Sequence, residues 1–229
     1  MSKKDIGVQV AVLAVALAVP AAAREHAPRL HLVWIDPVRL APGTYAEMKA
    51  ESTLVLEGLG AEVSWSEAPD GAVLGSEYTA VIAVPTHQLG DGDSRHIMGA
   101  TRPDTSLPPA VWIYPDQVAW ALGFDVRARP RWSPAQRSGF ARALARVVSH
   151  EVVHALGVPE HSSHGLMAAT LDRRALTAAS IAVDGKSAAA VQRALDGGAV
   201  VARVPAPPLR AGREATLPSG AIADRGPGG

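Results

Sequence analysis

The segment that most constrains the fold is a predicted helix that runs into a cluster of metal-binding side chains. Ser133 is expected to be its N-cap, because Pro134 suits the first helical position and Gln136 completes an S-x-x-Q capping box. No further proline occurs before Gly157, which stands where a left-handed C-terminal cap is expected. The sequence therefore predicts one long helix over residues 134–156.

The last turns of this helix contain the sequence HEVVH, from His150 to His154, which has the form HExxH. On a helix, positions i and i+4 lie one turn apart on the same face, so both imidazoles can reach a single metal ion. Glu151 lies beside them, where it can hold a water molecule without necessarily binding the metal. These residues predict the site of a zinc hydrolase.

The residues after the helix must supply a third ligand, because a catalytic zinc ion usually has three protein ligands and a fourth position for water. The chain has no cysteine, so every ligand must be a nitrogen or an oxygen atom. Glu160, His161 and His164 all follow the turn at Gly157, and all three are candidates. Their spacing alone leaves the choice among them open.

The run HEVVHALGVPEH, followed by GLM, resembles the metzincin zinc peptidases, including their matrixin branch. The family motif is HExxHxxGxxH with a downstream methionine turn, and four residues of this chain fall on it: His150, Glu151, His154 and Gly157. Glu160 stands at the strict third-ligand position, and a histidine follows one residue later. The loop is therefore one residue longer than the family pattern.

The downstream sequence HSSHGLM, from His161 to Met167, fits the register of compact bacterial members of this family. In these relatives the third histidine is followed by a small polar residue, two variable residues and then Gly-Leu-Met. The resemblance implies His161 as the third zinc ligand, beside His150 and His154. It also implies Met167 as the hydrophobic base under the metal, and Glu151 as the general base that activates water for peptide-bond hydrolysis.

The order of elements along the chain looks metzincin-like as well. Besides the long helix, two more helices are expected. One spans Thr44–Leu59 and begins with a T-x-x-E capping box, and the other spans Asp184–Leu195 near the C-terminus. Strands are expected at Leu30–Ile35, Ala61–Trp65, Tyr78–Val84, His96–Thr101 and Ala110–Val118. Pro115 indicates that the last strand bulges, ends there or lies at an edge, and Gly99 is expected at a bend or bulge.

The predicted fold class is therefore α+β, a metzincin-like catalytic domain. It has a twisted mixed sheet of about five strands, packed with an active-site helix, a crossover helix and a C-terminal helix. By the resemblance, residues 96–101 form an edge strand above the cleft. A protein or peptide substrate in extended form would pair with that strand.

Residues 1–23 have the features of a secretory signal peptide. Lys3 and Lys4 precede an apolar run from Ile6 to Pro20, and three alanines then offer a cleavage site before Arg24. An uncleaved anchor is the alternative, but the run is short for a spanning helix, which needs roughly 20 apolar residues. We therefore expect a mature protein that is secreted or periplasmic, with no stable membrane span after cleavage.

Composition bounds the remaining organisation of the chain. Residues 24–200 are long enough for one catalytic domain with a real core, whereas residues 201–229 are rich in proline, glycine and arginine and are expected to be a disordered tail. Lys+Arg and Asp+Glu each number 22, so no excess of positive charge favours a nucleic acid as a partner. The protein is expected to be a monomer.

The leading prediction is an exported zinc-dependent metalloendopeptidase with Zn²⁺ as its cofactor. Two other functions fit the same residues: a non-catalytic zinc-binding or interaction protein on a metzincin scaffold, and a zinc hydrolase of a non-peptide amide. The intact Glu151 favours catalysis, since a binding protein would tolerate the loss of that base.

Overall fold

The computed structural model describes residues 29–75, 78–84, 97–102 and 109–196. The predicted signal peptide (residues 1–23) and the predicted tail (residues 201–229) lie outside these ranges. His96, where the predicted edge strand begins, lies outside them too. The domain boundaries therefore stay predictions.

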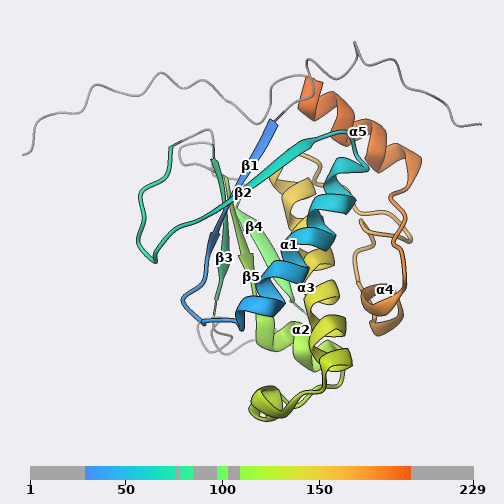
Figure 1. The fold of residues 1–229 in the computed structure, drawn as a ribbon. Coiled ribbons are helices and arrows are strands. Elements are labelled where there is room, and N and C mark those ends of the chain that lie inside the picture. The colour runs from blue at the N-terminus through green and yellow to red at the C-terminus, as the bar shows by residue number, and fades with distance from the viewer. Residues whose placement is uncertain (1–28, 76–77, 85–96, 103–108, 197–229) are drawn as a thin grey trace, which may run out of the picture.

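Among the described residues, five strands form one mixed sheet in the order β2-β1-β3-β5-β4 (Figure 1). The strands are β1 (Arg29–Ile35), β2 (Glu62–Glu67), β3 (Tyr78–Ala83), β4 (Gly99–Arg102) and β5 (Ala110–Ile113). Strands β1, β2, β3 and β5 run parallel, and β4 pairs antiparallel with β5 at one edge. The predicted α+β fold with a mixed sheet of about five strands is confirmed.

The helices are α1 (Pro42–Glu57), α2 (Pro115–Ala121), α3 (Pro134–Ala155), α4 (Arg173–Thr177) and α5 (Gly185–Asp196), with the 3₁₀ helix η4 (Val126–Arg131) before α3. Figure 1 shows α1 and α3 packed together against one face of the sheet, with α4 and α5 on the same side. Helix α1 connects the parallel strands β1 and β2, and parallel strands require such a crossover. The predicted crossover, active-site and C-terminal helices are α1, α3 and α5.

Helix α1 begins earlier than its sequence motif predicted. The T-x-x-E box predicted a cap at Thr44, but the N-cap is Ala41 and its side chain makes no capping hydrogen bond. Pro42 takes the first helical position, where its fixed φ favours a helix start and its missing N–H costs nothing. Thr44 is instead buried within the first turn, and its N–H donates to the carbonyl of Ala41 at 2.8 Å. The predicted capping box is wrong.

Two strand predictions need new boundaries. The strand predicted over Ala110–Val118 ends at Ile113, and Pro115 is the first residue of α2. A proline can end a strand or begin a helix, and the local sequence does not separate these outcomes. The predicted edge strand is β4, in which Gly99 is the first residue and not a bend within the strand.

Helix α3 follows its sequence signals closely. In the predicted capping box, Ser133 Oγ accepts the N–H of Gln136 at 3.2 Å, and the Gln136 side chain accepts the N–H of Ser133 at 2.9 Å. Gly157 has a φ of 87°, as a left-handed cap requires. Every residue from Ala143 to Val153 is buried, because the sheet, α1 and α4 surround this part of the helix. The helix therefore carries its last turns into the interior.

The side chains of β1 alternate between two apolar clusters, one on each face of the sheet. On the helix-covered face the larger core contains Leu30, Leu32 and Trp34. On the opposite face a smaller cluster contains Val33 and Ile35, and Ala68 and Leu74 from the chain that follows β2 pack against it. The candidate site lies at the end of α3 that the larger core supports.

A buried charge joins α3 to its neighbours. Arg146 is fully buried, and its guanidinium donates hydrogen bonds to the carbonyls of Ala175 and Ala178 in and just after α4. Its Nη2 also lies 3.8 Å from Oε1 of Glu51 on α1. A buried cation without partners would cost several kcal/mol, so these contacts hold α4 in place against α3.

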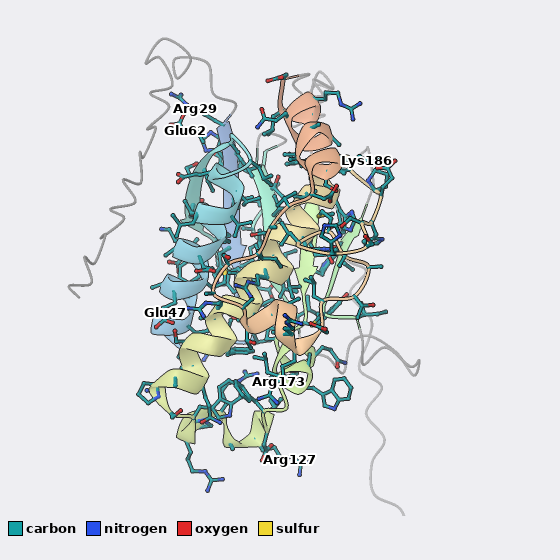
Figure 2. All side chains as sticks on the ribbon, turned by 90° about the vertical axis from the view of Figure 1, so that its right-hand side faces the viewer. Arg29, Glu47, Glu62, Arg127, Arg173 and Lys186 are labelled. Carbon is teal, nitrogen blue, oxygen red and sulfur yellow. The ribbon has the colours of Figure 1, made fainter. Side chains whose placement is uncertain are left out.

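Several charged side chains lie on the outside of the fold, among them Arg29, Glu47, Glu62, Arg127, Arg173 and Lys186 (Figure 2). Arg29 and Glu62, which are paired residues of β1 and β2, form an exposed ion pair with an Nε–Oε2 distance of 3.1 Å. Such exposed pairs contribute little to stability. Among the helices of the described ranges, none has the length and apolar character needed to cross a membrane.

Gly139 offers a test of the helix assignment. It lies inside α3, and a Cβ added there would meet nothing within 4 Å. Gly139→Ala is expected to raise the free energy of unfolding by about 0.5–1 kcal/mol, because alanine loses less backbone entropy in a helix. Chemical denaturation of the variant and the wild type measures this difference. A lower free energy of unfolding would contradict the position of Gly139 on an open helix face.

Candidate metal centre

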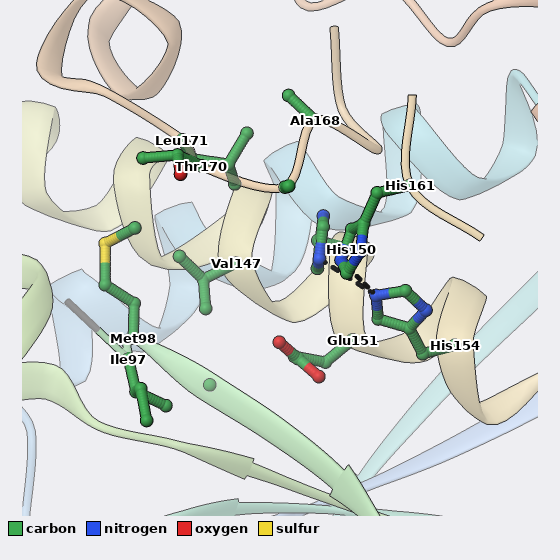
Figure 3. Close-up of a pocket in the computed structure, with 12 residues that line it drawn as sticks. Ile97, Met98, Val147, His150, Glu151, His154, His161, Ala168, Thr170 and Leu171 are labelled. Atoms are coloured by element: carbon green, nitrogen blue, oxygen red, sulfur yellow. Dashed lines mark hydrogen bonds between the residues drawn. The ribbon is translucent and has the colours of Figure 1, made fainter. Parts of the chain in front are cut away.

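Three histidine rings converge at the end of α3 and in the chain that follows it (Figure 3). Nε2 of His154 lies 3.0 Å from Nε2 of His150 and 3.1 Å from Nε2 of His161. His150 is buried, His154 is half-buried and His161 is exposed, so the cluster opens toward solvent on one side. Within the described residues, these three offer ligand atoms that all lie within 4.8 Å of one another.

Two backbone carbonyls determine which nitrogen of each helix histidine carries the proton. His150 Nδ1 lies 2.7 Å from the Leu166 carbonyl, and His154 Nδ1 lies 2.7 Å from the Val158 carbonyl. A carbonyl only accepts, so each Nδ1 donates and each Nε2 carries a lone pair. These lone pairs face each other at 3.0 Å, where they cannot form a hydrogen bond. A proton on His161 Nε2 would give a hydrogen bond to His154 but would leave the lone pair of His150 without a partner. A cation among the nitrogens would accept the lone pairs of all three rings.

The donor set fits a zinc ion. Zinc binds imidazole nitrogens at about 2.0–2.1 Å in tetrahedral geometry, which separates two ligand nitrogens by about 3.3 Å. The observed separations of 3.0 and 3.1 Å are close to that value. Burial lowers the pKa of His150 to about 4 and also lowers the pKa of His161. The lowered pKa values favour the neutral form of His150 and His161, which is the form that binds metal.

The other two candidates for the third ligand lie outside this group. Glu160 and His164 are both exposed, and His164 Nδ1 lies 3.0 Å from Ser163 Oγ within the loop. The extra loop residue therefore brings His161, and not Glu160, beside the two helix histidines.

Glu151 lies between the histidines and strand β4 (Figure 3). It is 8% exposed, and the hydroxyl of Thr101 lies 2.9 Å from its Oε2 and 2.8 Å from its backbone carbonyl oxygen. Burial raises the pKa of the Glu151 carboxyl to about 7, although the hydrogen bond from Thr101 acts in the opposite direction. A carboxyl with a pKa near neutrality can both accept and release a proton.

The histidines and Glu151 line a cavity of about 290 Å³. Most other lining residues are apolar and come from the approach to β4, from α3 and from the chain after Met167: Ile97, Met98, Val147, Ala168, Ala169 and Leu171. The ionisable groups are thus gathered on one part of a largely apolar wall, an arrangement typical of ligand sites. The cavity can hold a portion of a substrate next to the three nitrogens.

A glycine turn returns the chain from the last histidine toward α3. Gly165 has a φ of 76°, and a Cβ there would collide with the carbonyl oxygen of Ala182, so only glycine fits. The N–H of Leu166 donates to the same Ala182 carbonyl at 2.8 Å, and the Leu166 carbonyl accepts from His150. Met167 is fully buried, and its predicted position as the base under the metal stays a prediction.

Sequence reasoning missed what strand β4 contributes to this site. Gly99 and the preceding residue Met98 line the cavity, and Thr101 contacts Glu151 across a separation of 50 residues. No local pattern marks such a contact. The edge strand itself was expected from the family resemblance, but its side chains were given no role.

Solved structures with a similar fold include archaemetzincin from Methanopyrus kandleri, with a TM-score of 0.50 and 12% sequence identity over 73% of this chain and 96% of that chain. Metalloproteinase-II from Bacteroides fragilis has a TM-score of 0.46 and 11% identity over 74% of this chain and 54% of that chain. No family model matches the sequence, and no curated protein does. The likeness to archaemetzincin is one of fold, and it agrees with the predicted α+β architecture.

Alanine substitutions test the three-histidine group. Each of the substitutions His150→Ala, His154→Ala and His161→Ala removes a ligand. Loss of a residue that only contacts a ligand lowers metal affinity by about 10- to 100-fold, and loss of a ligand should lower it further. Glu160→Ala and His164→Ala are the matched controls and should bind zinc like the wild type. Competition of each purified variant with a chromogenic chelator gives the affinities. Full affinity in His161→Ala, with loss in Glu160→Ala or His164→Ala, would show that the third ligand is assigned wrongly.

Proposed function

We propose that this chain is a zinc-dependent metalloendopeptidase that acts outside the cytoplasm on extended protein or peptide substrates. The observation that carries the proposal is the convergence of three imidazole nitrogens beside a buried carboxyl group in an open cavity. Three nitrogen ligands leave a zinc ion room for a further ligand, and Glu151 supplies a base next to it.

The chemistry divides between the metal and Glu151. A zinc ion bound by the histidines supplies Lewis-acid chemistry, which lowers the pKa of water and polarises a carbonyl group. The Glu151 carboxylate accepts a proton from the water whose oxygen adds to the substrate carbonyl carbon. It then delivers that proton to the leaving nitrogen as the C–N bond breaks. The hydroxyl of Thr101 lies at Oε2, so Oε1 is the oxygen available to move the proton.

The edge of the sheet supports a substrate in extended form. Among the described strands β4 lies at one edge of the sheet, and β5 occupies one of its two hydrogen-bonding sides. A peptide can add to such an edge as a further strand, with its backbone groups paired and alternate side chains directed to pockets. The cavity lined by Met98, Val147 and Leu171 would receive an apolar side chain of that peptide.

The role of Glu151 is tested by Glu151→Gln, which keeps the size of the side chain but removes its ability to accept a proton. We expect kcat to fall by about 100- to 10,000-fold, the range that general acid–base catalysis contributes. Zinc content should stay near one equivalent, because the three histidines are unchanged. Cleavage of a denatured protein mixture and metal analysis of the same samples provide the two measurements.

Each other result of this experiment has a definite meaning. A wild-type protein that binds zinc but cleaves no protein would contradict the peptidase proposal and favour a non-catalytic zinc-binding protein. Hydrolysis of small amides without cleavage of proteins would favour a hydrolase of a non-peptide amide. Undiminished cleavage by Glu151→Gln would remove Glu151 from the mechanism.

Export is the second part of the proposal, and the N-terminal sequence supports it. Lys3 and Lys4, the apolar run and the three alanines before Arg24 have the order of a cleaved signal peptide. When the full chain is expressed in a bacterium with a secretory pathway, the extracytoplasmic product should begin at Arg24. N-terminal sequencing of that product is the measurement. A cytoplasmic protein that retains residues 1–23 would argue against export.

A further inference from the structure

We propose that Thr101 and Gly99 of strand β4 are positioning residues that hold the Glu151 carboxylate at the three-histidine cluster. The inference rests on the proposed function, because it gives Glu151 its role as the base. This role is separate from the backbone groups through which strand β4 would pair with a substrate. Both act through Glu151.

Thr101 contacts Glu151 at both its side chain and its main chain. Its Oγ1 lies 2.9 Å from Glu151 Oε2 and 2.8 Å from the Glu151 carbonyl oxygen. A single hydroxyl hydrogen directed between these two oxygens forms a three-centre hydrogen bond. Because the carbonyl belongs to the rigid helix α3, the hydroxyl is fixed relative to the helix and in turn fixes the rotation of the carboxylate.

Gly99 leaves the space that the Glu151 side chain occupies. Gly99 and Thr101 are two residues apart on one strand, so both face α3. A Cβ at Gly99 would lie 2.7 Å from Glu151 Cγ and 3.0 Å from both Glu151 Oε1 and Val147 Cγ1. Gly99 is not among the residues with a positive φ, so its backbone conformation does not require glycine. Glycine is required at this position because any side chain would collide with Glu151 and Val147.

Strand β4 is itself held in place by β5. Gly99 pairs with Ile113 and Thr101 pairs with Val111 in the antiparallel register, and the N–H of Tyr114 donates to the Met98 carbonyl at 2.9 Å. These contacts lie on the β5 side of the strand. The other side, where an extended substrate would pair, involves backbone groups and not the Thr101 hydroxyl. Removing that hydroxyl should therefore disturb the base without changing how a substrate binds.

The experiment compares Thr101→Val, Thr101→Ser and the wild type as full-length, zinc-loaded proteins. Valine has the shape of threonine but cannot donate, so kcat should fall by about tenfold or more, with KM and zinc content unchanged. Serine restores the donor and should restore kcat. Thr53→Val is the matched control, because the Thr53 hydroxyl also makes a partly buried side-chain hydrogen bond, 3.1 Å from Trp65 Nε1, at the opposite edge of the sheet. It should leave kcat unchanged.

A structural measurement separates this inference from the proposed function. Crystal structures of the zinc-loaded wild type and of Thr101→Val provide the comparison. In the variant, the Glu151 carboxylate should be rotated away from its wild-type position. This comparison needs no activity. A protein without peptidase activity would overturn the proposed function, but its crystal structures would still show whether Thr101 positions the Glu151 carboxylate. In Gly99→Ala the same carboxylate should be displaced by the added methyl group.

Three results would overturn the inference. These are an unchanged kcat in Thr101→Val, a loss of kcat that Thr101→Ser does not restore, and a Glu151 carboxylate that keeps its position in the Thr101→Val crystal structure. If Thr101→Val does not fold, Thr101→Ala replaces it, because alanine also removes the donor and has no γ-methyl group that could clash. The same predictions and the same contrary results then apply to that variant.

Discussion

The hydrogen bond from His150 Nδ1 to the carbonyl of Leu166 joins the two segments on which the candidate site depends. His150 belongs to α3, whose position is set by its burial against the sheet, and Leu166 belongs to the turn after the last histidine. The bond fixes the tautomer of the ring and holds the turn against the helix. Ala182 anchors Leu166 from the other side, and the N–H of Ser162 donates to the Met167 carbonyl at 2.7 Å. These contacts hold the loop that carries His161 in a fixed position relative to α3.

Burial of the helix end also determines its chemistry. The ionisable groups that α3 carries into the interior each have a partner on another segment: Arg146 with α4, His150 with the turn and Glu151 with β4. The same desolvation lowers the pKa of His150 and raises the pKa of Glu151. One physical cause thus favours a neutral metal ligand at one position and a proton-accepting carboxyl at the next. The buried part of α3 therefore contributes ionisable groups to the candidate site as well as apolar side chains to the core.

The parts of the fold that could be predicted from the sequence are those set by local chemistry. The capping box at Ser133 and the left-handed glycine at Gly157 are properties of adjacent residues, and both were predicted correctly. The box at Thr44 was also local, but Pro42 gives a stronger start signal, and the helix follows the proline. The contacts of Thr101 with Glu151 and of Arg146 with the end of α4 join residues far apart in the chain, so no local pattern could reveal them. The position of His161 lies between these cases: family resemblance favoured it, whereas spacing alone did not decide among the three candidates.

Three histidines that share one metal ion form the centre of the proposed site, and X-ray absorption at the zinc edge tests this arrangement most directly. Zinc-loaded full-length protein should show three imidazole nitrogens and one further light atom at about 2.0–2.1 Å, in tetrahedral geometry. Multiple scattering from the imidazole rings reports their number. A coordination shell with two imidazoles and a carboxylate, or a protein that binds no zinc at neutral pH, would contradict the central claim.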